Sequence, residues 1–259
     1  VMPAYENLMK ELANLLGSGK NTGGLYYLPQ GKEYYAWLVK STTGDDSGIE
    51  AIEERIRQEI VQVSGEVQTL LSSDHGLTSI SLDEYESQEP AEIISSLQQM
   101  ITRDFPEAPQ VSCQIKYVHD SLQDYLSPAF YLTPAIDDTD RNVIYINPAR
   151  DFNALELYTT LAHEGYPGHL YESTWFNSTN PHPIRKLLNF SGYSEGWATY
   201  VEMRSFAWTG VSDSIAQALS ANQDFSLGLC ARVDMGVNYQ GWTREETTEY
   251  MNQFGMGDE

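Results

Sequence analysis

The segment LAHEGYPGHLYES, residues 161–173, decides the chemistry of this chain and much of its fold. It begins like the zinc-peptidase pattern His-Glu-x-x-His, in which two histidines four residues apart on one helix bind a single metal ion. Here His169 follows His163 by six residues, and a Pro-Gly pair lies between them. On an unbroken helix the two imidazoles would point about 120° apart, so an ideal helix cannot bring both to one ion.

The Pro167-Gly168 pair can break the helix between the two histidines and so change the direction in which His169 points. Proline lacks an amide proton and clashes with the carbonyl four residues before it, while glycine adopts backbone conformations that are closed to other residues. We expect a bulge or broken turn that absorbs the two extra residues and lets His169 lie beside His163. The alternative is a helix that simply ends at the Pro-Gly pair, with two unrelated histidines.

The residues before the motif predict the helix that carries it. Asn153 and Glu156 have the spacing of a capping box, and apolar residues then recur at helical spacing. We expect a helix over residues 153–166 with His163 and Glu164 in its last turns. Neighbouring helical residues diverge by about 100°, so Glu164 can reach a metal-bound water from the side while His163 binds the metal.

The segment YSEGWATYVEMRSF, residues 193–206, offers a third ligand. Glu195 and Glu202 share one helical face there, and carboxylates toward an apolar interior need a partner. Zinc peptidases of the glutamate-ligand type take a ligand from such a downstream helix, so we expect Glu195 to bind Zn²⁺. Glu202 lies about 10 Å farther along by helix rise. It either orients His163 or His169 through a hydrogen bond or faces solvent.

This ligand set predicts hydrolytic chemistry. Two neutral imidazoles and one carboxylate leave Zn²⁺ positive enough for its bound water to ionise near neutral pH. Glu164 would accept that proton and deliver it to the leaving amine. The oxyanion needs a further donor, for which Tyr200 and Tyr239 are candidates, as is Tyr193. With 17 tyrosines in the chain, a core or rim role is the alternative for any single one.

The remaining pattern predicts a mainly α fold with a small β-sheet, in the α+β class. Apolar residues at helical spacing predict helices within residues 5–21, 47–73 and 89–105. Clustered β-branched and aromatic residues predict short strands at residues 111–118, 129–134 and 142–148. Either of the last two strands could offer an edge that binds an extended peptide, or both could be ordinary core strands.

Composition limits the classes of function. With 259 residues, 41% of them hydrophobic, we expect one metallopeptidase-like domain over residues 1–259, with a looser subdivision into a helical part, 1–110, and a catalytic part, 111–259. The net charge of −22 excludes nucleic acid as a partner. No apolar run long enough to span a membrane is present, and we expect no signal peptide in this stretch, although a precursor could have carried one. Two cysteines exclude a cysteine-based zinc ribbon, so a transition metal must use histidine and carboxylates.

The two motifs HEGYPGH and YSEGWATYVE together resemble the bacterial family catalogued as domain of unknown function 885, which is regarded as a family of zinc peptidases with a His-Glu-x-x-Pro-Gly-His motif. Softer matches extend over most of the chain, at residues 28–44, 127–148 and 231–251. The resemblance implies a zincin fold of the gluzincin type. It carries over His163, His169 and Glu195 as metal ligands and Glu164 as the base. It also implies a secreted or lipid-anchored protein of the bacterial cell envelope.

The chain departs from the family pattern at two places. Many relatives carry a histidine in the GVNYQGW segment where this chain has Asn238. The chain also ends at FGMGDE, before the segment where relatives finish, so we expect it to be a fragment of a longer protein.

These observations together predict a zinc-dependent peptidase acting on a peptide substrate. The alternatives are another zinc hydrolase, such as an amidase, and a non-catalytic envelope binding protein that retains the fold.

Overall fold

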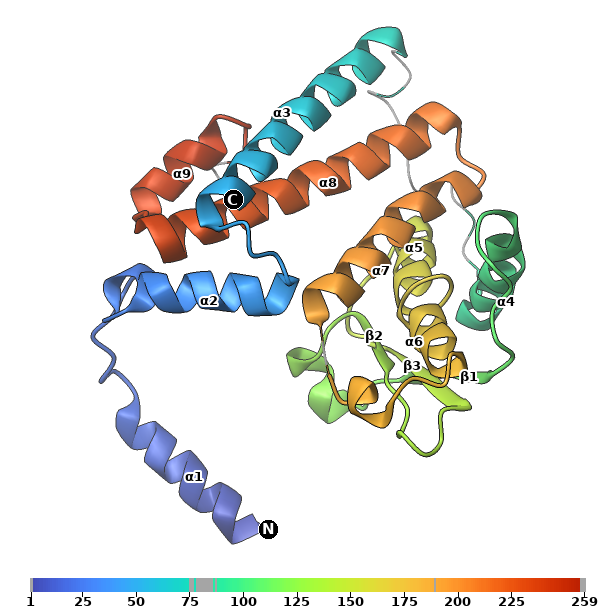
Figure 1. Cartoon of the computed structure of the whole chain (residues 1–259), viewed down its shortest axis with the longest axis horizontal. Coiled ribbons are helices and arrows are strands. Elements are labelled where there is room, and N and C mark those ends of the chain that lie inside the picture. The colour runs from blue at the N-terminus through green and yellow to red at the C-terminus, as the bar shows by residue number, and fades with distance from the viewer. Residues whose placement is uncertain (1, 75–76, 78–85, 87, 189, 257–259) are drawn as a thin grey trace. The chain divides into compact units, whose positions relative to one another are not determined.

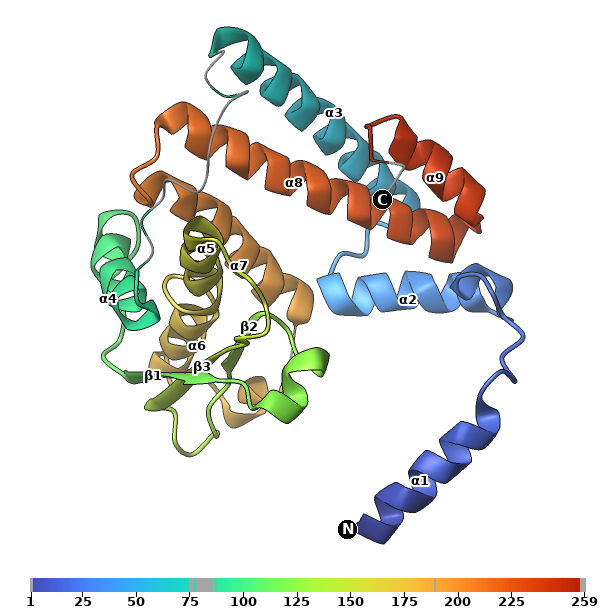
Figure 2. The same cartoon turned by 180° about the vertical axis from the view of Figure 1, so that it is seen from behind.

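The computed structural model describes residues 2–74, 77, 86, 88–188 and 190–256, and its contacts form two compact units (Figures 1 and 2). Unit 1 comprises Val1–Lys40, Asp45–Gln58 and Leu227–Glu259, and unit 2 comprises Ser41–Gly44 and Glu59–Ser226. The expected subdivision into residues 1–110 and 111–259 stays a prediction. The two units are defined by contacts, and unit 2 contains segments from both of those ranges.

Unit 2 contains the small sheet that the sequence predicts. Its strands are β1 (Ser112–Tyr117), β2 (Ala129–Leu132) and β3 (Arg141–Ile146), in the order β1-β3-β2. β1 runs parallel to β3 with Ser112 opposite Arg141, and β2 runs antiparallel to β3 with Ala129 opposite Ile146. The three predicted strands are confirmed. β2 pairs with β3 along one side only, so it is an edge strand.

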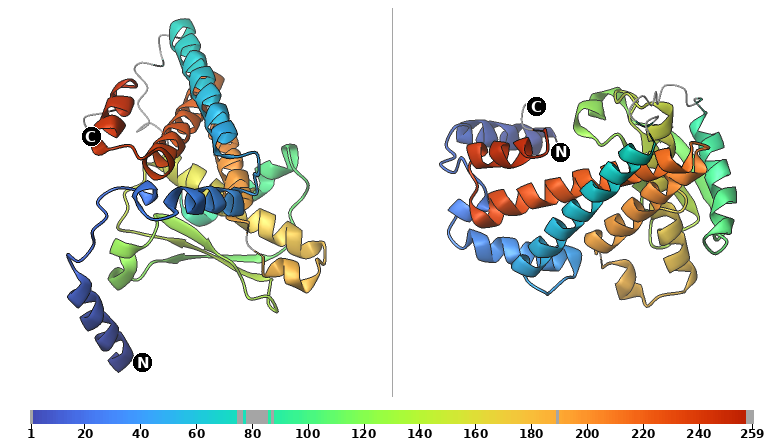
Figure 3. Two further views of the ribbon diagram at one scale, coloured as in Figure 1. Left: turned by 60° about the vertical axis from the view of Figure 1, so that its left-hand side comes forward. Right: turned by 90° about the horizontal axis from the view of Figure 1, so that it is seen from above.

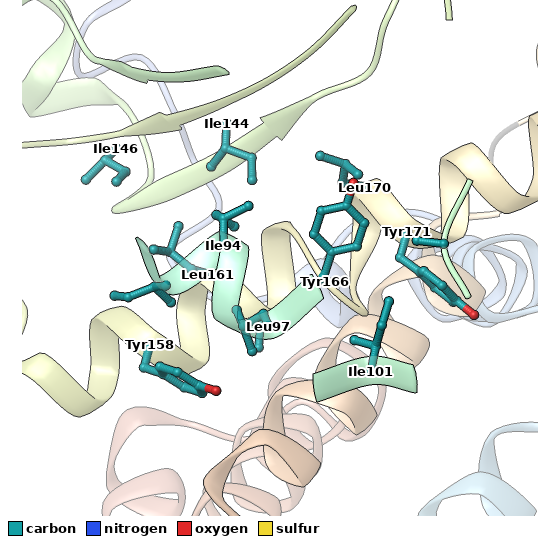
Figure 4. Close-up of a cluster of buried hydrophobic side chains, with 13 residues drawn as sticks. Ile94, Leu97, Ile101, Ile144, Ile146, Tyr158, Leu161, Tyr166, Leu170 and Tyr171 are labelled. Carbon is teal, nitrogen blue, oxygen red and sulfur yellow. The ribbon is translucent and has the colours of Figure 1, made fainter. Parts of the chain in front are cut away.

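Helices cover this sheet and form the core of unit 2 with it. The left view of Figure 3 shows α5 (Ala154–Glu164) and α6 (His169–Ser178) on the same side of the strands. Ile144 and Ile146 are two residues apart on β3, so they face one way, and both are buried. Figure 4 shows them pointing toward Ile94 of α4 (Pro90–Met100) and Leu161 of α5. Burying each such side chain contributes about 1.5–3 kcal/mol.

Helix α5 begins where the capping box predicts. The Asn153 side chain accepts a hydrogen bond from the Glu156 amide at 2.9 Å, and the Glu156 carboxylate accepts one from the Asn153 amide at 3.0 Å. The helix ends at Glu164, two residues earlier than expected, because the backbone leaves the helical path at Gly165. A fixed start determines which residues of α5 face the core, and therefore where His163 points.

Helix α7 (Ser191–Ser205) packs against α5. Each helix carries a fully buried alanine, Ala162 on α5 and Ala198 on α7, and small side chains allow helices to approach closely. Near the start of α5, Leu155 joins a separate buried cluster with Phe206 and Ala216. The helix predicted at residues 193–206 is confirmed.

Unit 1 has its own small core. It contains α1 (Met2–Leu15), most of α2 (Gly31–Thr43), the first part of α3 (Ile49–Ser73), the end of α8 (Asp213–Met235), a π-helical turn (Gly236–Gln240) and α9 (Arg244–Asn252). Tyr35, Ile49 and Met235 are the buried residues of one hydrophobic cluster there. The predicted helices in residues 5–21, 47–73 and 89–105 are confirmed as α1, α3 and α4.

Short 3-10 turns complete the described elements, at Leu25–Tyr27, Ile101–Arg103, Asp120–Tyr125, Pro183–Lys186 (η6) and Phe206–Trp208. None of the helices in the described ranges combines the length and the apolar composition needed to cross a membrane. The fold is therefore mainly helical with a three-stranded sheet, as the sequence predicts.

Candidate metal centre

The turn between α5 and α6 absorbs the two extra residues of the motif. The Gly168 amide donates to the Ala162 carbonyl at 2.9 Å, and the Tyr171 amide donates to the Gly165 carbonyl at 3.1 Å. Each bond reaches back six residues instead of the four of an α-helix. The Tyr166–Pro167 peptide bond inside this turn is cis. The backbone therefore loops out by two residues and resumes as α6 at His169.

Close contacts hold this turn in place. The Trp197 indole of α7 donates a hydrogen bond to the Pro167 carbonyl at 2.8 Å. A β-carbon added to Gly168 would lie 1.7 Å from the carbonyl oxygen of His163, so the backbone passes where only glycine fits. The Pro-Gly pair is thus a specific connection and not merely a helix end.

The turn brings the two histidines together. The ring centroids of His163 and His169 are 4.8 Å apart, with the ring planes at 83°. Glu195 from α7 completes the group, because its Oε2 lies 3.6 Å from Nε2 of His163 and 3.6 Å from Nε2 of His169. Three helices thus contribute one potential metal-binding atom each, and these atoms lie within 4.8 Å of one another.

These atoms fit a zinc ion. Zinc binds imidazole nitrogen and carboxylate oxygen at about 2.0–2.2 Å, which separates the ligand atoms of a tetrahedral site by about 3.3 Å. The separation of 3.6 Å between Glu195 and each histidine is close to that value. Two imidazoles and one carboxylate are also a ligand set that zinc hydrolases use. The side chain of Glu195 is 63% exposed, so solvent reaches the cluster.

A hydrogen bond with another side chain orients each imidazole at its Nδ1 atom. His163 Nδ1 lies 2.9 Å from Glu202 Oε2, so the Glu202 carboxylate accepts a hydrogen bond from it. His169 Nδ1 lies 3.3 Å from Ser194 Oγ, whose hydroxyl in turn donates to Glu172 at 2.5 Å. Both Nδ1 atoms are thereby occupied and both Nε2 atoms are left for an ion.

The sequence analysis named Glu202 but missed Ser194 and Glu172. The sequence positions of Ser194 and Glu172 relative to the predicted ligands could have identified them. Glu172 follows His169 by three residues on the same helix, and Ser194 directly precedes Glu195. Their role as hydrogen-bond partners depends on the packing of α6 against α7.

Glu164 lies beside the histidines and is held by the sheet. Its side chain is buried, and its Oε2 accepts a hydrogen bond from the backbone amide of Tyr131 on β2 at 2.7 Å. Burial raises the pKa of Glu164 to about 7, although the charge of His163 and the Tyr131 amide act to lower it. A carboxyl group with such a pKa exchanges a proton readily near neutral pH.

The two histidines differ in their own proton affinity. Burial lowers the pKa of His163, but the hydrogen bond and charge of Glu202, together with the charges of Glu164 and Glu195, outweigh it and raise this pKa above the usual value. Burial lowers the pKa of His169, and the neighbouring His163 lowers it further.

The three candidate tyrosines occupy different surroundings. Tyr193 lines a cavity together with His169 and Glu195. Tyr200 lines a separate hollow between α7 and parts of α3 and α8. Tyr239 belongs to unit 1, where its hydroxyl donates to Glu50 at 2.9 Å. An oxyanion-stabilising role for Tyr200 or Tyr239 stays a prediction.

Asn238, where the family resemblance implied a histidine, has a local structural role. Its side-chain oxygen accepts a hydrogen bond from the Leu25 amide at 3.1 Å, and its side-chain nitrogen donates to the Asp234 carboxylate at 2.9 Å. The bond to Leu25 joins the 3-10 turn Leu25–Tyr27 to the π-helical turn within unit 1.

Comparisons with known proteins identify a family and a fold. The family model described as "Bacterial protein of unknown function (DUF885)" matches residues 1–259. No curated protein matches the chain. A solved "putative lipoprotein" from Colwellia psychrerythraea is similar, with a TM-score of 0.78 and 23% identity over 99% of this chain and 48% of that one. A second, a "putative lipoprotein of unknown function" from Shewanella oneidensis, has a TM-score of 0.63 and 16% identity over 95% of this chain and 50% of that one. The chain thus spans about half the length of each.

Proposed function

The chain belongs to the DUF885 family of bacterial proteins of unknown function, and from this premise we propose that it is a zinc-dependent peptidase with a zincin-like catalytic region. The observation that carries the proposal is the cluster of His163, His169 and Glu195, whose ligand atoms lie within 4.8 Å of one another, with the buried carboxyl group of Glu164 next to His163 in the chain. This combination of three ligands and an adjacent base is what metal-assisted hydrolysis requires.

His163, His169 and Glu195 would hold the ion. Bound zinc supplies a Lewis acid that polarises a carbonyl group and increases the acidity of a water molecule. Glu164 accepts the proton from the attacking water and returns it to the leaving amine. The near-neutral pKa of Glu164 suits both halves of this transfer, because the group can be deprotonated before attack and protonated before the amine leaves.

Strand β2 supports an extended peptide as the substrate. The Tyr131 amide points to Glu164 and not to β3. Because the amide and carbonyl of one residue in an antiparallel strand point to the same side, the carbonyl of Tyr131 and the polar groups of Ala129 also point away from β3. A peptide that pairs with this edge would pass next to the Glu164 carboxyl group. This arrangement favours a peptide over a compact amide substrate.

A non-catalytic binding protein is the rival from a different class. The two similar structures are each described as a "putative lipoprotein", which supports a location in the bacterial cell envelope for this chain and suits either function. The buried Glu164 next to the cluster favours catalysis, since a binding surface gains nothing from a buried carboxyl group whose charge is costly there.

Metal analysis and one variant test the proposal. We expect protein purified without any chelator to contain close to one equivalent of zinc. A mixed peptide library, read by mass spectrometry, should be cleaved by the wild type. Glu164→Gln should lower the rate by about 100-fold to 10,000-fold, because a general base contributes this much. The variant should keep its zinc.

Glu107→Gln is the matched control, since this glutamate is exposed and is not among the groups that act on His163, Glu164 or His169, so its loss should leave zinc content and cleavage unchanged. Zinc content far below one equivalent would refute the proposal. So would cleavage that survives Glu164→Gln. Peptide binding without any turnover by the wild type would favour the binding protein, and cleavage restricted to amides outside a peptide chain would favour the amidase.

A further inference from the structure

A cavity of about 550 Å³ opens next to the cluster, and its chemistry suggests what part of a substrate enters it. His169 and Glu195 form part of its wall, and the chain that follows β2 forms another part at Thr133 and Pro134. A peptide paired along β2 that continues past Thr133 would therefore place its next residue in this cavity.

Two cations of η6, Arg185 and Lys186, also line the cavity. The Arg185 guanidinium lies over the ring of Phe176 on α6, 5.3 Å from the ring centroid. Within the part of the chain that the structure describes, neither cation forms an ion pair. The aromatic ring thus helps to position Arg185 while leaving its N–H groups without a carboxylate.

The charges of the cavity favour an anion once a divalent ion is bound. Glu172 and Glu195 bring two negative charges to its wall, and Arg185 and Lys186 bring two positive ones, so the formal sum is zero with His169 neutral. A divalent cation at His169 and Glu195 would raise that sum to plus two. This local excess contrasts with the net charge of −22 of the whole chain. Screening over about 8 Å at physiological ionic strength lets the local charges dominate inside a cavity of this size.

We propose that this cavity binds a carboxylate group of the peptide substrate, with Arg185 as its main ligand and Lys186 in support. The proposal deepens the peptidase function and rests on it. A planar guanidinium carries its N–H groups in its own plane, where they match the two oxygens of a carboxylate, and contact with an aromatic ring leaves those N–H groups available. The carboxylate comes either from the C-terminus of the peptide or from an aspartate or glutamate side chain near the cleaved bond.

The experiment measures peptide binding to the zinc-loaded full chain carrying Glu164→Gln, which prevents turnover. Three peptides of one neutral sequence are compared: one with a free C-terminus, one with an amidated C-terminus, and one amidated but containing a single glutamate. We expect the free acid, the glutamate peptide or both to bind at least 10-fold more tightly than the neutral amide, and the pattern identifies the source of the carboxylate. Adding Arg185→Gln should abolish this preference.

Two further variants separate binding from folding. Arg185→Lys keeps the charge and should retain part of the preference, whereas Arg103→Gln removes an exposed arginine from outside this cavity and should retain all of it. Thermal unfolding of each variant checks that the fold persists. Equal affinity for all three peptides, or a preference that survives Arg185→Gln, overturns the proposal.

Titration with glutarate keeps this result distinct from failure of the peptidase function. Glutarate binding that requires Arg185 supports the carboxylate site even in a protein that cleaves no peptide. If the protein cleaves peptides but shows no preference for a carboxylate, the peptidase function stands and the carboxylate site is rejected. If the protein neither binds glutarate nor prefers a peptide with a carboxylate, the carboxylate site is rejected, whether or not the protein cleaves peptides.

Discussion

Gly168→Ala tests whether the turn between α5 and α6 is what creates the metal centre. The new β-carbon would lie 1.7 Å from the carbonyl oxygen of His163, 2.4 Å from its carbonyl carbon and 2.5 Å from the carbonyl oxygen of Ala162. An ordinary contact begins near 3.4 Å, so the backbone at the His163 carbonyl and at residue 168 must separate by about 1.7 Å. No flexible side chain can make this room, because the atoms that clash are backbone atoms.

Two losses should follow. Overpacking of this kind costs about 3 kcal/mol, which corresponds to a fall of about 6–12 °C in the Tm of unit 2. His169 directly follows Gly168, so its ring moves relative to His163 by more than the roughly 0.5 Å that a preorganised site tolerates. We expect the affinity for zinc to fall on the order of 100-fold or more.

The assay combines thermal unfolding with competition for zinc against a chelator of known affinity. Gly196→Ala is the matched control, since nothing lies within 4 Å of a β-carbon there and the residue is exposed in the interior of α7. This control should stabilise the protein by about 0.5–1 kcal/mol, because glycine is unfavourable within a helix. Gly168→Ala protein with the Tm and zinc affinity of the wild type would refute the reasoning.

Three other predictions concern individual side chains. Ser194→Ala should reduce zinc affinity by about 10-fold to 100-fold, because it frees the Nδ1 atom of His169. Cys113 should react with iodoacetamide at pH 8 about 200-fold more slowly than a free thiol, because burial raises its pKa to about 11, whereas the exposed Cys230 should be alkylated first. Arg232→Ala should destabilise unit 1 by about 3 kcal/mol, since it removes the buried cation that pairs with Glu53 and leaves that carboxylate with the more exposed Arg57 alone.

Each of these has its own control and contrary result. Ser191→Ala removes a hydroxyl from the same helix and should keep full zinc affinity; an equal loss in both serine variants would reject the orienting role. Peptide mapping follows the alkylation, and equal labelling of the two cysteines would contradict the burial of one thiol. Arg244→Ala, at the exposed start of α9, should cost less than about 0.5 kcal/mol, and a similar value for Arg232→Ala would rule out a buried pair with Glu53.

Local patterns in the sequence determined the elements of this protein. The capping box at Asn153 and Glu156 places the start of α5, and the β-branched runs place all three strands, since capping and side-chain alternation depend on residues a few positions apart. The same local reasoning located His163, Glu164, His169 and Glu195 as candidates.

The sequence predicts a bulge at the Pro-Gly pair, but it does not predict the hydrogen bonds that hold the bulge. The hydrogen bond from Gly168 to Ala162 and the indole bond from Trp197 to Pro167 require α7 to lie against the turn. Their partners are fixed by the packing of helices and not by spacing along the chain.

Tertiary structure alone decided the environment of the site. The Tyr131 amide reaches Glu164 because β2 is the edge strand beside α5, and burial in that place raises the pKa of the carboxyl group to about 7. Glu172 reaches His169 only through Ser194 on another helix, and Arg185 gains its place over Phe176 from a turn on the cavity wall. Residue types and periodicity carry information over one or two helical turns, whereas burial, charge and hydrogen bonding between distant segments come into existence only when those segments pack.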